Sequence, residues 1–86
     1  MTLESYHQHL LFNMYSKKII GHRYKSIEKI ARICKWQDIV AEHGGGRIKT
    51  VIRQLSRLGL VNLHGKGKVA SLTQNGVLYV RGEFNV

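Results

Sequence analysis

The sequence contains one cysteine, few acidic residues and no apolar run long enough to cross a membrane. A lone cysteine, Cys34, cannot form an internal disulfide, so a disulfide-stapled scaffold is excluded and a small buried hydrophobic side chain is expected. Because a signal-peptide pattern and a run of about eighteen apolar residues are both absent, we expect a soluble, cytoplasmic protein without a membrane partner. Low-complexity tracts are also lacking, so the 86 residues, 43% of them hydrophobic, predict one folded domain over residues 1–86.

The sequence also lacks the side-chain patterns that catalysis and metal binding require. Its five acidic residues are scattered, and no serine or cysteine stands in an evident relation to a histidine. His7 and His9 are two positions apart, which on a helix points them away from each other, whereas a zinc site needs three or four converging ligands. We therefore predict a protein that is not an enzyme, with no metal, no other cofactor and no small-molecule ligand.

What the chain has in excess is positive charge. Fourteen lysines and arginines against five acids give a net charge of +9 at pH 7, which favours a polyanionic partner, nucleic acid first. The charge is uneven, since residues 47–68 hold six basic residues and no acid, whereas residues 26–46 are neutral overall. Solvated surfaces usually mix both signs, so an acid-free basic run indicates a binding surface.

Apolar spacing predicts the helices. A stripe of one helix runs from about Leu3 to Lys18, with Thr2 as a plausible N-cap and Gly21 at the break that follows. Two short helical stretches are predicted next, at 26–34 and 37–43, with Trp36 between them as a core anchor. The three glycines at 44–46 cannot lie in a stable helix interior, so they are predicted to form a turn.

The clearest pattern spans residues 47–58. Its apolar side chains recur at helical spacing, and Gly59 stands where a left-handed residue ends a helix. Residues 61–72 then alternate around the turn Gly65-Lys66-Gly67, which predicts a β-hairpin. The segment 73–86 is compatible with either a short helix capped by Thr73 or a strand.

In chain order these elements are a short helix, a glycine turn, an amphipathic helix with a basic outer face and a basic hairpin. The major groove of B-DNA admits one helix, and a helix-turn-helix presents its second helix there. Arginine can contact guanine with two hydrogen bonds and glutamine can contact adenine in the same way, whereas lysine and threonine more often bind phosphate. The candidate DNA-binding residues of the helix are Arg47, Lys49, Thr50, Arg53, Gln54 and Arg57. The candidates on the hairpin are His64, Lys66 and Lys68.

The run from Asp38 to Val61 resembles winged helix-turn-helix transcription regulators of bacterial and archaeal type, including MarR/PadR-like and archaeal or archaeal-virus proteins. The resemblance rests on Thr50-Val51, on Leu58-Gly59-Leu60-Val61, and on Leu72-Thr73 followed by Gly76. It implies an α+β winged helix-turn-helix fold with three to four helices, a C-terminal hairpin wing over 61–72 and an extra N-terminal helix within 1–22.

Two assignments of the helix-turn-helix within the helical core, 26–61, are open. One pairs the stretch 37–43 with the helix at 47–58, and we prefer it for its spacing. The other takes 3–18 and 26–34 as the two helices and leaves 36–46 as an inserted loop. In the preferred assignment the helix at 3–18 is an addition to the core whose apolar stripe needs a partner, and in small winged-helix regulators such flanking helices commonly build a homodimer.

These observations predict a sequence-specific, double-stranded DNA-binding protein, a transcriptional regulator that acts as a homodimer. An alternative of another class is a structural RNA-binding module like the winged-helix proteins of ribosomes, or a non-specific architectural DNA-binding protein. A third is a protein–protein adaptor with a degenerate winged helix.

Overall fold

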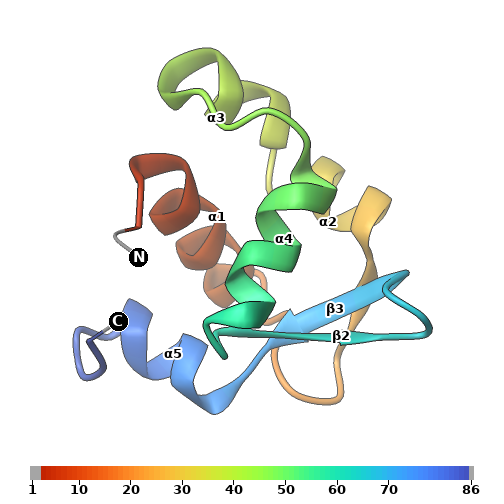
Figure 1. The fold of residues 1–86 in the computed structure, drawn as a ribbon, viewed down its shortest axis with the longest axis vertical. Helices are drawn as coiled ribbons and strands as arrows, with labels where there is room; N and C mark the ends of the chain where they lie inside the picture. Colours follow the sequence, from red (N-terminus) through yellow and green to blue (C-terminus); the bar gives the residue numbers. More distant parts are fainter. Residues whose placement is uncertain (1–2, 86) are drawn as a thin grey trace.

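Five α-helices and a three-stranded antiparallel sheet make up residues 3–85, the part of the chain that the computed structural model describes (Figure 1). The elements in chain order are α1 (Ser5–Ser16), β1 (Lys25–Ser26), α2 (Ile27–Ile33), α3 (Trp36–His43), α4 (Ile48–Arg57), β2 (Val61–His64), β3 (Val69–Leu72) and α5 (Gln74–Val80). The α+β class and the C-terminal hairpin are confirmed, and the layout is compatible with a winged helix. The five helices of the described residues agree with the expected three to four together with an N-terminal helix.

The sheet ties the two halves of the chain together. Its strand order is β1-β3-β2, so the hairpin strand β3 lies between its own partner and the two-residue strand β1. The segment after α1 joins the same strand, because the amide of Leu72 donates to the Ile19 carbonyl at 2.8 Å and the amide of Gly21 donates to the Leu72 carbonyl at 3.0 Å. The hairpin is therefore held from both sides rather than projecting freely along its whole length.

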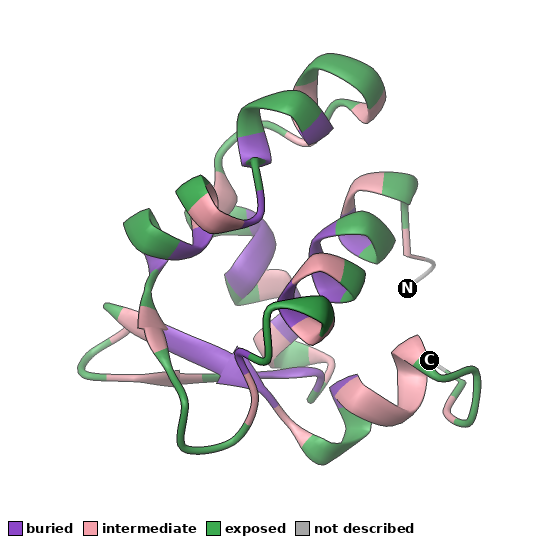
Figure 2. Cartoon of the chain, turned by 180° about the vertical axis from the view of Figure 1, so that it is seen from behind, coloured by how far each residue is buried: buried purple, intermediate pink, exposed green. Residues whose placement is uncertain are grey.

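Helix α1 belongs to the hydrophobic core. Leu10, Leu11 and Met14 are fully buried, and they join one cluster with the apolar residues of α2, α4 and the sheet. The expectation of an added helix with its stripe free for a second copy is therefore wrong, because the chain itself covers that stripe (Figure 2). The expected cap Thr2 lies outside the described residues, and Glu4 occupies the N-cap position of α1.

The two middle helices are arranged differently from both predicted assignments. Residues 36–43 are helical, so the idea of an inserted loop there is wrong. Lys35, with φ of 55°, separates α2 from α3 and turns the chain between them. In space, α4 packs on α2 and β2, whereas α3 packs on α1 and α2 (Figure 1). Of the two middle helices, α2 rather than α3 packs on α4, and α3 supplies the connection that leads into α4.

Of the two alternatives for the C-terminal segment, a short helix or a strand, the structure has the helix, α5, with Thr73 as its N-cap. The Thr73 hydroxyl accepts a hydrogen bond from the Gly76 amide at 2.9 Å and donates one to the Gly59 carbonyl at 2.6 Å, so a single side chain caps α5 and fixes it to the end of α4. Gly76 is buried, and a Cβ there would collide with the backbone carbonyl of Leu60. Glycine is required at this position by close packing.

We predict that Gly76→Ala destabilises the protein. Alanine normally stabilises a helix by about 1 kcal/mol relative to glycine, but crowding against a backbone carbonyl typically costs about 1–3 kcal/mol. Urea unfolding followed by circular dichroism measures the change. Asn75→Ala, at the exposed neighbouring position, is the control and should leave stability unchanged or slightly higher. A Gly76→Ala variant as stable as the unaltered protein would contradict the close packing of Gly76 against Leu60.

Candidate nucleic-acid interface

Helix α4 divides into a buried and an exposed face. Val51, Ile52 and Leu55 are buried at 1% exposure or less. The opposite face carries basic and hydroxyl side chains, and these predicted residues are all exposed: Arg47, Lys49, Thr50, Arg53 and Arg57. Gly59, with φ of 77°, follows the helix, and the Leu60 amide returns to the Leu55 carbonyl at 3.0 Å, as the sequence predicts. The result is a firmly anchored helix with a cationic outer face.

The glycine turn before α4 is held by aromatic side chains. Gly44, Gly45 and Gly46 have φ of 79°, 125° and 77°, conformations that glycine adopts without the steric cost of a side chain. A Cβ at Gly45 would lie 2.9 Å from the Tyr6 ring, so the turn is also tightly packed. The Trp36 indole is 6% exposed and donates a hydrogen bond to the Gly46 carbonyl at 2.9 Å. The predicted core anchor therefore also sets where α4 begins.

A groove joins α4 to the hairpin. It has a volume of about 850 Å³ and lies between α2, the start of α4 and the hairpin turn, with three basic residues in its lining, Arg32, Lys49 and Lys68. The structure thus brings one predicted helix residue and one predicted hairpin residue together. Glu28 is the acid among the described lining residues. Basic residues from α2, α4 and the hairpin turn thus line the same groove.

Arg32 is the residue that sequence reasoning missed. It lies in the neutral segment 26–46, where nearby acids balance its charge in the sum. The pairing of β1 with β3 places the start of α2 against the hairpin, and the Ile27 amide donates to the Lys68 carbonyl at 3.1 Å. No local pattern in the sequence indicates this contact, because a two-residue strand produces no detectable periodicity.

The hairpin residues do not form a single cluster. Lys66 and Lys68 are exposed in the turn, where their ammonium groups can reach a partner. His64 is only half-buried, and its ring centroid lies 4.2 Å from that of Tyr24. The structure therefore places Lys68 beside α4 and His64 against the segment that leads into β1.

Gln54 stands apart from the exposed row of α4. Its side chain is half-buried, and its Oε1 lies 2.9 Å from Nε2 of His7, which is fully buried on α1. The expected adenine contact uses both the oxygen and the nitrogen of the glutamine amide. The oxygen faces His7 within the protein, so the side chain is not oriented for that paired contact.

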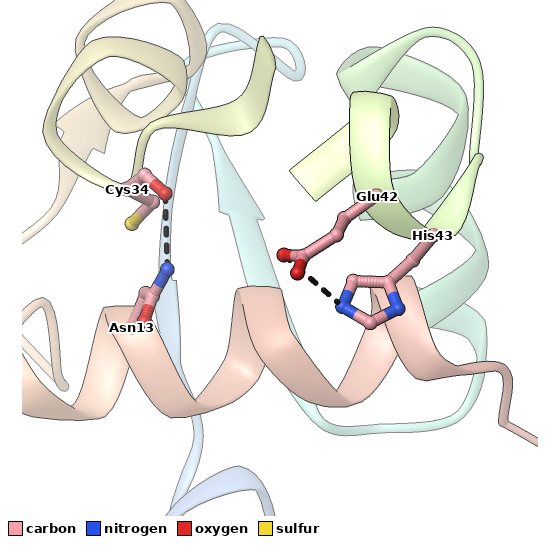
Figure 3. A network of polar contacts seen from close by, with 4 residues as sticks. All are labelled: Asn13, Cys34, Glu42 and His43. Carbon is pink, nitrogen blue, oxygen red and sulfur yellow. Dashed lines mark hydrogen bonds and ion pairs between the residues drawn. The ribbon is translucent and has the colours of Figure 1, made fainter. Parts of the chain in front are cut away.

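Two of the remaining histidines lie close together near an acidic side chain. His9 stacks on His43 with ring centroids 4.2 Å apart, and Glu42 lies 3.7 Å from His43 (Figure 3). Within residues 3–85 no group of three or more histidine, cysteine or acidic side chains converges as a metal site would require. In the same range, no helix has the length and apolar character needed to cross a membrane.

Cys34 is a core residue, as predicted. Its side chain is 1% exposed, and its backbone carbonyl accepts a hydrogen bond from the side-chain Nδ2 of Asn13 at 3.0 Å (Figure 3). Burial raises the pKa of the thiol to about 11, and the nearby Lys17 lowers it by a smaller amount. A thiol in this state is not a nucleophile near neutral pH.

Comparison of the chain with protein-family models, with curated proteins and with solved structures finds no match. The role of the basic surface is therefore inferred from the positions of its own residues.

The raised pKa of Cys34 predicts a loss of stability at alkaline pH. The unfolded thiol ionises near its ordinary value of 9.0, while the folded thiol stays protonated to about 11, so the free energy of unfolding falls as pH rises between these values. Urea unfolding at pH 8, 9, 10 and 11 measures the decline. Cys34→Ser removes this titration, and its curve should be flatter; parallel curves for the two proteins would contradict burial of the thiol.

Proposed function

We propose that this chain is a winged helix-turn-helix protein that binds double-stranded DNA sequence-specifically and acts as a transcriptional regulator in the form of a homodimer. The observation that carries the proposal is the exposed basic face of α4 beside the groove of Arg32, Lys49 and Lys68. A helix of this kind fits the major groove, and a basic hairpin next to it fits the adjacent phosphate backbone.

The position of each basic residue indicates whether it would contact bases or phosphates. Arg53 and Arg57 lie one turn apart on the outermost row of α4, where a docked duplex would present base edges, and arginine pairs with guanine by two hydrogen bonds. Lys49, Lys68 and Arg32 surround the groove instead, so they are assigned to phosphate oxygens. Arg47, Thr50 and Lys66 would extend the backbone contacts at either end of the row.

The second copy needs a surface other than the buried stripe of α1. A groove of about 620 Å³ lies between α1 and residues 79–85, with Phe12, Tyr79 and Phe84 in its lining. Phe12 is 56% exposed, the largest value among the exposed large hydrophobic residues of the described chain. The described lining includes no charged residue, whereas copies of a chain with a net charge of +9 repel each other elsewhere. This uncharged groove is therefore the surface proposed for the homodimer.

Arg53→Ala tests the reading role of α4. Selection of bound duplexes from a random pool, followed by titrations at several salt concentrations, should show a preferred site for the unaltered protein and steeply salt-dependent binding. The variant should lose preference at one or two base pairs, with affinity for the preferred duplex reduced about 10- to 100-fold, the equivalent of ~1–3 kcal/mol.

Arg81→Ala is the matched control, because it removes the same charge from a residue that pairs with Glu83 at 2.8 Å outside the candidate interface. It should leave the preferred sequence unchanged. Equal affinity of the unaltered protein for all duplexes would contradict a regulator and favour an architectural role. Ready displacement of the duplex by structured RNA would favour the RNA-binding module.

Phe12→Lys tests the homodimer. A lysine in each copy places like charges in the proposed interface, so sedimentation equilibrium should show a dissociation constant raised at least about tenfold. Tyr24→Lys is the control, since Tyr24 is the other exposed large hydrophobic residue of the described chain at 40% exposure and lies outside the groove. A monomeric unaltered protein, or equal effects of the two substitutions, would contradict this interface.

A further inference from the structure

His7 is a fully buried polar residue placed between two helices. Its Nδ1 lies 3.0 Å from the backbone nitrogen of Glu4, and its Nε2 lies 2.9 Å from Oε1 of Gln54, which is 47 positions away in the sequence. Both ring nitrogens are thus engaged, one by the start of α1 and the other by α4. The imidazole is the direct polar connection between the N-terminal helix and the proposed reading helix.

These contacts determine where the ring carries its proton. A backbone N–H can only donate, so Nδ1 must offer its lone pair to Glu4. The neutral ring then carries its proton on Nε2, and that N–H donates to the oxygen of Gln54. The orientation of the Gln54 side-chain amide is fixed in the same way, because only its oxygen can accept this hydrogen bond.

The consequence is that the NH2 group of Gln54 is the free end of the amide. Among the described residues it has no hydrogen-bond partner, and no unpartnered side-chain nitrogen or oxygen is sealed from solvent there, so the NH2 group reaches the surface. Gln54 lies one turn after Thr50 at the margin of the exposed row. It therefore presents its two N–H donors to a partner, while its oxygen faces His7.

We infer that His7 is a positioning residue that sets the base preference of α4 by holding the Gln54 amide with its donors outward. The inference rests on the proposed function. In the major groove guanine offers two acceptors, N7 and O6, whereas adenine offers an acceptor and a donor. An amide held with its NH2 group outward and its oxygen toward His7 matches guanine and turns its acceptor away from the adenine N6 donor, so Gln54 selects guanine over adenine.

The first test needs no DNA. Nitrogen-15 NMR of the imidazole of His7 should show a protonated Nε2 and an unprotonated Nδ1, and Gln54→Leu should speed exchange of the Nε2 proton with water. A proton on Nδ1 would overturn the inference. This result stands whether or not the protein binds duplex DNA, so it separates failure of the inference from failure of the proposed function.

The second test reads the preference itself by selection from a random duplex pool. Gln54→Leu identifies the base pair concerned. Gln54→Glu keeps an oxygen for His7 but turns an acceptor outward, so guanine at that base pair should be replaced by cytosine, whose N4 group donates. His7→Leu frees the amide to rotate, and the guanine-to-adenine ratio should fall about two- to tenfold there and nowhere else.

His22→Leu is the matched control, since His22 is exposed between α1 and β1, lies outside both grooves and makes no contact with Gln54 among the described residues. It should leave the ratio unchanged. If His7→Leu lowers affinity equally for every sequence, His7 is only structural and the inference is overturned. If His7→Leu does not fold, Gln54→Glu decides, because an unchanged guanine preference in that variant also overturns the inference.

Discussion

Burial of the apolar stripe of α1 beneath the rest of the chain is the contact on which this fold depends. Leu10, Leu11 and Met14 have no exposed surface and meet the inward residues of α4 and the sheet in one core. A domain of this size has little apolar area to spare, so an uncovered stripe would remove a large part of its stabilisation. From α1, His7 contacts Gln54 of α4 and Tyr6 packs against the glycine turn that precedes α4. The packing of α1 therefore helps to fix both the position of α4 and the orientation of its Gln54 side chain.

The positive charge is organised by this packing rather than simply spread over the surface. Repulsion among cations destabilises a compact chain. Arg32, Lys49 and Lys68 nevertheless converge on one groove, because the short pairing of β1 with β3 brings α2 to the hairpin. The opposite groove, beside Phe12, has an uncharged lining within the described chain. Figure 1 places the hairpin on one side of the molecule and α1 with α5 on the other, so the two grooves lie apart.

Local chemistry made several features predictable from the sequence. The apolar spacing over 47–58, Gly59 as the helix end and the hairpin over 61–72 depend on residues within one or two turns of each other, and all three are present in the structure. The exposure of Arg53, Arg57 and their neighbours follows from the same periodicity, because burying one face of a helix exposes the other. The burial of Cys34 and Trp36 also follows from their position among apolar residues.

The sequence by itself therefore determined a basic amphipathic helix, its stop, the hairpin behind it and the excess of charge. The tertiary structure alone decided the burial of α1, the packing of α2 rather than α3 on α4, the place of Arg32 and the orientation of Gln54. Each of these depends on segments far apart in the chain, as the 47 positions between His7 and Gln54 illustrate. Periodicity reports which face of a helix is apolar, but it contains no information on which distant residue will cover that face or bond to its edge.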